Sequence, residues 1–199
     1  MLVDEYNTFY RENPNRWESA SHDRYIFEAV APYGQAVNLL DVGCGNGHTL
    51  HYFKSRWPHT DCHGVDLSSE AIRIARKRNP NINFKCADWE HENYIGFDTI
   101  LLAGVAEHFQ DPDRGLKRLH DALTFDGIAY LEVPNCIGYP TAEKGEGYRR
   151  INQGSRQMEW HLYRKTWEKK ILDAGLRIVK AITGPTIYME FIWLLERNE

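Results

Sequence analysis

Short apolar runs alternate with amphipathic stretches over most of the chain. Continuous apolar runs bounded by glycine, proline or an acid predict buried strands, whereas apolar residues spaced three and four apart predict helices. The predicted strands span residues 37–42, 61–67, 82–88, 97–105 and 128–133, and helices are expected after the first, second and fourth of them. This alternation predicts βαβ units around a mostly parallel sheet, with helices on both faces.

Local signals mark several boundaries of these elements. Ser68 is placed to cap the second helix, which Pro80 stops, and Asp111 followed by Pro112 is typical of a helix start. The "FDG" at residues 125–127 predicts a turn into the fifth strand.

The pattern changes after Pro134. Residues 135–163 are rich in glycine, charge and aromatics and show no clear period, so they predict an irregular segment with a functional role. A helix is expected over 165–174, and strands over 176–183 and 187–196 are expected to pair as an antiparallel hairpin.

Composition narrows the classes of protein. The 199 residues are 42% hydrophobic, which suits one core and one domain, and the net charge of −4 gives no positive field for nucleic acid or an anionic membrane. The beginning resembles no leader, and no run approaches the roughly 18 apolar residues of a membrane span. Four scattered cysteines form no C-x-x-C pair. We therefore expect a cytoplasmic monomer or homodimer without a metal site.

The stretch "LLDVGCGNGHTL", residues 39–50, places three glycines at alternate positions between the first strand and its helix. The dinucleotide pattern G-x-G-x-x-G would need a glycine where His48 stands, and a phosphate loop would need a lysine that is absent. Ligands of open parallel sheets bind beyond the carboxyl ends of the strands, where this turn lies. Glycines let a ligand approach the backbone, and the helix N-terminus behind them favours an anionic group.

An acid completes this pattern as Asp41-x-Gly43-x-Gly45-x-Gly47, which resembles motif I of the class I S-adenosylmethionine-dependent methyltransferases. The segments "LLAGVAEHFQDP" and "ALTFDGIAYLEVPN" are similar to the segments that the family carries around its fourth and fifth strands. The resemblance covers about residues 36–199. It is greatest for small metal-independent enzymes such as the O-methyltransferases of ubiquinone biosynthesis.

The resemblance implies a single Rossmann-like α/β domain with a seven-stranded, mostly parallel sheet in the order 3-2-1-4-5-7-6, its last strand antiparallel. Residues 36–199 would form this methyltransferase domain, residues 1–35 a helical lid, and residues 135–163 an insertion that covers the substrate.

It also implies S-adenosylmethionine as cofactor, with S-adenosylhomocysteine as product. Asp41 would accept from the cofactor's ammonium group or brace the loop, Asp66 would hold the ribose hydroxyls, and Asp88 would accept from the adenine amino group. The expected cofactor-binding residues are Asp41, Gly43, Cys44, Gly45, Gly47, Asp66, Leu67, Asp88, Trp89 and Ala103. In the alternative interpretation the three acids only cap turns or face solvent, and Trp89 is a core residue.

Methyl transfer from a sulfonium is an in-line displacement, in which positioning can lower the barrier by roughly 7–11 kcal/mol and a base adds about 100-fold to 10,000-fold. The candidate bases are Glu107 and His108, which follow the fourth strand, and His161 in "MEWHLY". Either histidine could instead hold a loop or bond the backbone.

The expected acceptor is a small molecule, methylated at oxygen, with nitrogen as second choice. The chain lacks [DNS]-P-P-[YF] after the fourth strand and the acidic set of catechol-type enzymes, which argues against base amines and catechols. Small-RNA terminal methyltransferases bind magnesium through E-x-x-E-H and a later histidine, but Gly104 stands at the first glutamate position.

A lid over the acceptor is expected from four aromatic residues, with two arginines available for a carboxylate. These residues are Tyr139, Tyr148, Trp160 and Tyr163, and Arg149 and Arg150. Two other functions stay open: a non-catalytic cofactor-binding protein whose lid binds a partner, and a nicotinamide oxidoreductase.

Overall fold

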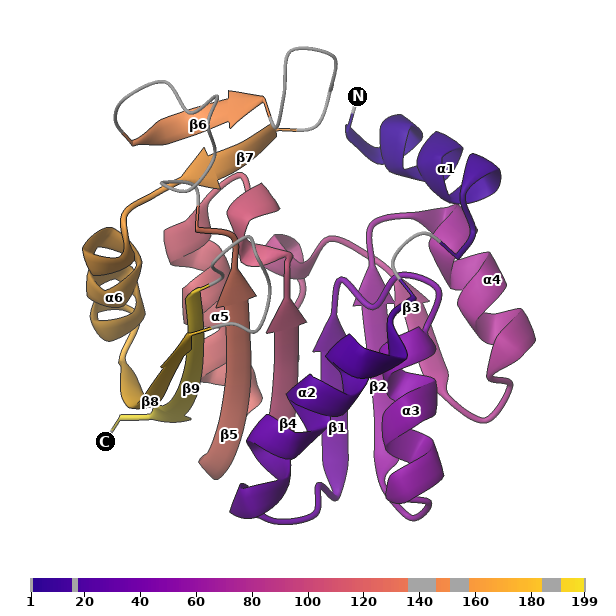
Figure 1. The fold of residues 1–199 in the computed structure, drawn as a ribbon, viewed down its shortest axis with the longest axis horizontal. Coiled ribbons are helices and arrows are strands. Elements are labelled where there is room, and N and C mark those ends of the chain that lie inside the picture. The colour runs from indigo at the N-terminus through magenta and orange to yellow at the C-terminus, as the bar shows by residue number, and fades with distance from the viewer. Residues whose placement is uncertain (1, 16–17, 136–145, 151–157, 184–190, 199) are drawn as a thin grey trace.

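Seven strands form one mixed sheet in the computed structural model, which describes residues 2–15, 18–135, 146–150, 158–183 and 191–198 (Figure 1). They are β1 (Asn38–Val42), β2 (Asp61–Asp66), β3 (Asn83–Cys86), β4 (Phe97–Ala103), β5 (Leu123–Val133), β8 (Leu176–Thr183) and β9 (Phe191–Arg197). Their order is β3-β2-β1-β4-β5-β9-β8, with β1 to β5 parallel and β9 antiparallel to both neighbours. This is the predicted order once β6 and β7, which form a separate sheet, are left out of the count.

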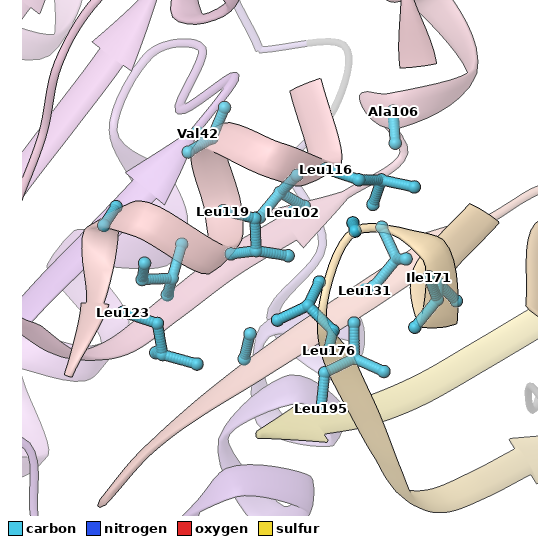
Figure 2. Close-up of a cluster of buried hydrophobic side chains, with 14 of the residues drawn as sticks. Val42, Leu102, Ala106, Leu116, Leu119, Leu123, Leu131, Ile171, Leu176 and Leu195 are labelled. Atoms are coloured by element: carbon cyan, nitrogen blue, oxygen red, sulfur yellow. The ribbon is translucent and has the colours of Figure 1, made fainter. Parts of the chain in front are cut away.

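Helices cover both faces of the sheet, as predicted. One layer contains α2 (Ala20–Val30), α3 (His48–Arg56) and α4 (Ser69–Arg78), and the other contains α5 (Pro112–Ala122) and α6 (Arg164–Asp173). Along β4 the buried side chains alternate, because Leu101 faces the first layer and Leu102 the second. Figure 2 shows the second core, in which Leu116 and Leu119 of α5 lie over Leu102. Each leucine buried in this way contributes about 1.5–3 kcal/mol.

The predicted helix caps are in place. The Ser68 hydroxyl accepts from the Ala71 N–H at 3.1 Å, and the Asp111 carboxylate accepts from the Arg114 N–H at 3.2 Å. These side chains satisfy N–H groups that the first turn of a helix leaves without a partner. The hairpin of the last two strands is also confirmed, with β9 beginning at Phe191 and residues 184–190 lying outside the described part.

The predicted turn before the fifth strand is wrong. β5 begins at Leu123 and continues through the "FDG" sequence. Phe97 pairs with Leu123, but Thr99 pairs with Ile128, so the extra residues of β5 are taken up as an irregularity in the pairing with β4. The glycine and aspartate therefore accommodate a bulge within one strand.

The segment 135–163 contains more regular structure than its sequence predicted. β6 (Gly147–Arg150) and β7 (Met158–His161) pair as a two-stranded antiparallel sheet. Residues 136–145 and 151–157 are outside the described part. In Figure 1 this small sheet lies beyond the carboxyl ends of the parallel strands, where the sequence placed a covering segment.

The helices of the first 35 residues lie in two different parts of the fold. α1 (Leu2–Glu12) lies beyond the strand ends near β3 and α4, whereas α2 packs against α3 and β5 (Figure 1). Ile26 and Val30 of α2 are fully buried. A short 3-10 helix (η1, Ala31–Tyr33) then leads into β1. Only α1 therefore occupies the position expected of a lid, and α2 belongs to the core layer.

Within the part of the chain that the structure describes, none of the helices has the length and apolar character needed to cross a bilayer.

Candidate functional site

The turn between β1 and α3 has a left-handed backbone at all three glycines. Gly43, Gly45 and Gly47 have φ angles of 71°, 52° and 77°. A methyl group on Gly43 would lie 2.0 Å from the Cγ2 atom of Val105, and one on Gly45 would lie 2.5 Å from the hydroxyl oxygen of Tyr10. Conformation and space therefore both exclude a side chain at these two positions.

Asp66, at the end of β2, connects this turn to α4. One carboxylate oxygen accepts from the Gly45 N–H at 2.9 Å, and the other accepts from the Ser68 N–H at 2.8 Å. Burial raises the pKa of Asp66, and these two hydrogen bonds oppose that effect. Each carboxylate oxygen has a second lone pair, so Asp66 can accept from two ligand hydroxyls without releasing the turn.

Two further buried carboxylates lie close to the turn. Burial raises the pKa of Asp41 well above its ordinary value, and the charges of Asp23 and Asp66 add to the effect. Asp23 accepts from the Thr49 hydroxyl at 2.8 Å and forms an ion pair with His48. A cation bound beside Asp41 would favour its charged form and so oppose the rise in its pKa.

Asp88 and Leu67 lie at the ends of the two outer strands of this half. Asp88 caps the 3-10 helix η2 (Trp89–His91), accepting from the Glu90 N–H at 3.0 Å, and lies 3.1 Å from the imidazole of His91. Leu67 is 37% exposed, as an apolar wall of a binding site would be. The roles expected for Leu67 and Asp88 toward the cofactor stay predictions.

Trp89, in contrast, is a core residue. Its side chain is only 4% exposed, and its indole N–H donates to the Gly115 carbonyl of α5 at 3.0 Å. The expectation that its ring would line the cofactor site is therefore not supported by the position of the side chain. Cys44 is also buried, with its sulfur against Gly64, whereas Ala103 is half-buried at the end of β4.

The candidate bases come together from two distant segments. Glu107 and His108 lie on the 3-10 helix η3 (Ala106–His108), directly after β4, and His161 lies on β7. The His108 and Glu107 side chains are 3.8 Å apart, and His161 lies 2.9 Å from Glu159. Both glutamates are buried.

This cluster adjoins the glycine turn. The Val105 side chain, which closes the space at Gly43, immediately precedes η3. The indole N–H of Trp160, on β7, donates to the Phe109 carbonyl at 3.0 Å and so attaches β7 to the end of η3. The glycine turn, η3 and β7 therefore form one continuous surface at the strand ends.

Helix α1 spans both parts of this surface. The Asn7 side-chain oxygen accepts from Ser68, Ser69 and Glu70 at the start of α4, at distances between 2.9 and 3.2 Å. From the adjacent position on α1, the Tyr6 ring lies edge-on to His108, with centroids 6.3 Å apart. Burial raises the pKa of the Tyr10 hydroxyl, and the charge of Asp66 adds to this effect.

Of the predicted lid residues, Trp160 is half-buried and Tyr163 is 45% exposed. Tyr139 lies outside the described residues, and for Tyr148, Arg149 and Arg150 the structure describes only the backbone of β6. Among the described side chains, no three His, Cys, Asp or Glu residues are arranged to hold a metal ion.

Among the described residues, sequence reasoning missed four buried acids, which are Asp23, Glu90, Glu132 and Glu159. Asp23 shares the apolar face of α2 with Ile26 and Val30, and an acid at that spacing was a usable signal. Glu90 accepts from the Gln110 and Asp111 N–H groups at 2.8 and 2.7 Å, and thereby joins η2 to α5. Glu159 stood in a segment without periodicity, so no local signal was available.

The chain was compared with protein families, with curated proteins and with solved structures, and each comparison found methyltransferases. A family described as "Methyltransferase domain" matches residues 40–129. The trans-aconitate 2-methyltransferase of Rhodopseudomonas palustris (strain BisB18) is 29% identical over 114 residues, which are 57% of this chain and 44% of that protein. The match thus spans less than half of the relative's length.

Two solved structures have the same fold. The 1,6-didemethyltoxoflavin-N1-methyltransferase of Burkholderia thailandensis, solved with 1,6-didemethyltoxoflavin and S-adenosylhomocysteine, has a TM-score of 0.80 and 16% identity over 100% of this chain and 88% of its own. An S-adenosylmethionine-dependent methyltransferase of Clostridium acetobutylicum ATCC 824 has a TM-score of 0.76 and 12% identity, with both chains fully covered.

The sheet order and the glycine turn at the strand ends define a Rossmann-like nucleoside-binding domain. The comparisons make this assignment narrower. The family match over residues 40–129, the curated relative and the solved structures together support a class I S-adenosylmethionine-dependent methyltransferase, an enzyme class whose cofactor is S-adenosylmethionine.

Proposed function

We propose that this protein transfers a methyl group from S-adenosylmethionine to a small molecule, at oxygen in the first instance and at nitrogen as the second choice. The observation that carries the proposal is the contact between Gly43 and Val105. It places the cofactor turn directly beside η3, which presents the protonatable side chains of Glu107 and His108.

The chain's own residues fit this cofactor. The turn backbone at Gly43 and Gly45 packs against Val105 and Tyr10, and Asp66 lies at the end of β2, where its carboxylate would accept from the ribose hydroxyls. Asp88 would accept from the adenine amino group, beside Leu67. The buried Asp41 favours the ammonium group of the cofactor, since a nearby cation lowers the cost of its charge.

When bound, S-adenosylmethionine supplies a methyl group whose bond to sulfur breaks, with the electron pair going to sulfur, as a lone pair of the acceptor forms the new bond. The residues of this chain then have two tasks. The walls formed by α1 and η3 align the acceptor, and a side chain of the cluster accepts the acceptor's proton. Alignment accounts for the larger part of the acceleration.

The relatives support a small acceptor. Trans-aconitate, the substrate in the name of the Rhodopseudomonas protein, is a small organic acid whose only heteroatoms are oxygens. The Burkholderia enzyme acts on a small heterocycle at nitrogen N1. Buried imidazoles and carboxylates can take a proton from a hydroxyl or from a ring nitrogen, which is why nitrogen remains the second choice.

The test is incubation of the protein with a metabolite extract and S-adenosylmethionine that carries an isotopically labelled methyl group. Mass spectrometry should find a labelled small molecule that is absent when the protein is heat-inactivated. The position of the label, from fragmentation, decides between oxygen and nitrogen.

A calorimetric titration with S-adenosylhomocysteine belongs to the same test. Binding without any labelled product would favour a non-catalytic cofactor-binding protein, whereas stabilisation by NADH and not by S-adenosylhomocysteine would favour an oxidoreductase.

A further inference from the structure

The two histidines of the cluster differ in how they are held. The imidazole of His108 is 21% exposed and lies 3.8 Å from the nearest Glu107 oxygen, beyond hydrogen-bond distance. The imidazole of His161 is 11% exposed, and its Nε2 atom lies 2.9 Å from the Oε1 atom of Glu159. The second pair is therefore the tighter and the drier of the two.

β7 directs this pair toward the site. Glu159 and His161 are two residues apart on a strand, so their side chains share one face, and Trp160 fixes the strand by its hydrogen bond to Phe109. β7 packs against η3, which carries the first pair. The arrangement brings two glutamates and two histidines together next to the cofactor turn.

The cluster contains a carboxyl group whose pKa is close to neutral pH. Burial raises the pKa of Glu159 to about 7, the charge of Glu107 adds to the effect, and that of His108 opposes it. Both glutamates are only 4–5% exposed, so their mutual repulsion is poorly screened by water. A proton added near neutral pH is therefore readily held by this group of side chains.

We propose that Glu159 and His161 form the acid–base pair of the acceptor site, with His161 as the base and Glu159 as the residue that positions it. This inference rests on the proposed function. The proton leaves the acceptor as the new bond to carbon forms, and it ends on the imidazole of His161, where the Glu159 carboxylate stabilises the resulting imidazolium. A carboxylate that orients a histidine and balances its charge is the arrangement of a general-base pair.

The experiment compares the pH dependence of labelled-product formation, from the metabolite extract, between the wild-type chain and Glu159→Gln. The glutamine has the same shape without the charge, so the imidazolium loses its stabilisation and the base becomes weaker. We expect the rate near pH 7 to fall at least about tenfold, since one pKa unit of lost imidazolium stabilisation corresponds to a factor of ten. The acidic limb of the profile should move to lower pH by about one unit.

Two further variants define the roles. His161→Ala should lower the rate by about 100-fold, the low end of a general base's contribution. Glu159→Asp keeps the charge and should retain the wild-type position of the acidic limb. Both should bind S-adenosylhomocysteine as the wild type does in calorimetry, because neither residue belongs to the cofactor turn.

The chain offers a matched control. Glu132 of β5 is equally buried, and its carboxylate lies 2.9 Å from the imidazole of His22 on α2. Glu132→Gln removes the same kind of pair from the contact between α2 and the sheet. It should lower the melting temperature without moving the acidic limb.

The outcomes separate the two proposals. No labelled product from the wild-type chain would overturn both. Product formation with an acidic limb that Glu159→Gln leaves in place, or that Glu132→Gln moves equally, would overturn the Glu159–His161 pair alone.

Discussion

The two sides of the strand-end site are built in different ways. The proposed donor side consists of Asp41, the turn at residues 43–47 and Asp66, and its geometry comes from backbone φ angles and from N–H groups that donate to a carboxylate. The proposed acceptor side consists of Glu107 and His108 on η3 and Glu159 and His161 on β7. Its geometry comes from side-chain pairs and from the packing of β7 against η3.

This difference corresponds to two kinds of recognition, one of the cofactor and one of the acceptor. A nucleoside cofactor can be recognised by backbone groups and a few acids at fixed positions on regular strands, since these need no adjustment from one acceptor to another. An acceptor must be recognised by side chains, and those come from η3 and from a small sheet outside the main one. Variation in that sheet therefore changes the acceptor site while the donor side remains intact.

The largest loss of stability is expected for Gly43→Ala. This variant tests whether the geometry of the donor side depends on the backbone conformation of the glycine turn. The left-handed φ costs about 1–2 kcal/mol for alanine, and the contact with Val105 adds about 1–3 kcal/mol. We expect the free energy of unfolding in urea to fall by about 3 kcal/mol. Binding of S-adenosylhomocysteine should weaken as well.

Gly96→Ala is the control for this variant. Gly96 also has a positive φ, of 83°, but a methyl group there would meet nothing within 4 Å. Gly96→Ala should therefore lower the free energy of unfolding by only about 1 kcal/mol. Equal losses for the two variants would show that φ strain alone, and not the contact with Val105, determines the effect.

Next in size is Asp66→Ala, which tests the side-chain part of the donor side. Hydrogen bonds to a charged group contribute about 1.5–3 kcal/mol each, so loss of the contacts to the ribose should weaken binding of S-adenosylhomocysteine by about 100-fold in calorimetry. Asp61→Ala removes an exposed carboxylate from the other end of the same strand and should leave the affinity unchanged. An unchanged affinity of Asp66→Ala would remove Asp66 from the binding site.

The smallest effect concerns Asp41→Asn in the absence of ligand. The folded state raises the pKa of Asp41, so its charge opposes folding above the unfolded value of about 4 and has no effect well below it. The asparagine variant should therefore be more stable than the wild type at neutral pH, by on the order of 1 kcal/mol, and this advantage should vanish toward pH ~3. Urea unfolding at both pH values measures it.

Asp126→Asn, which removes an exposed carboxylate of β5, should change the free energy of unfolding by no more than about 0.5 kcal/mol. If Asp41→Asn were less stable than the wild type at both pH values, the charge of the buried Asp41 would not oppose folding. In that case only the buried glutamates of the proposed acceptor side, and not the aspartates of the turn, would carry a cost for their charge.

Local sequence patterns were sufficient for the glycine turn and for most of the sheet. The strand order, the Ser68 and Asp111 caps and the position of Asp66 at the end of β2 follow from signals that lie within a few residues of each element. These signals are hydrophobic period, capping chemistry and the demand for glycine at a positive φ. Each depends on neighbours along the chain, so a sequence displays it directly.

Other features were decided only when distant segments met. Trp89 looked equally suited to a ligand wall and to the core, and the contact with Gly115 of α5 selected the core. The division of the N-terminal helices between site and core, the bulge in β5, and the role of Asp23 as the partner of His48 likewise depend on elements far away in the chain.

The sequence by itself indicated the class of this protein and its cofactor, and it located the glycine turn between the first strand and its helix. The tertiary structure decided which side chains stand together at the acceptor side, above all the approach of Glu159 and His161 to Glu107 and His108. The physical reason is separation along the chain. Roughly fifty residues lie between the two pairs, and no hydrophobic period or capping signal encodes a contact across that distance until the sheet and its covering strands have packed.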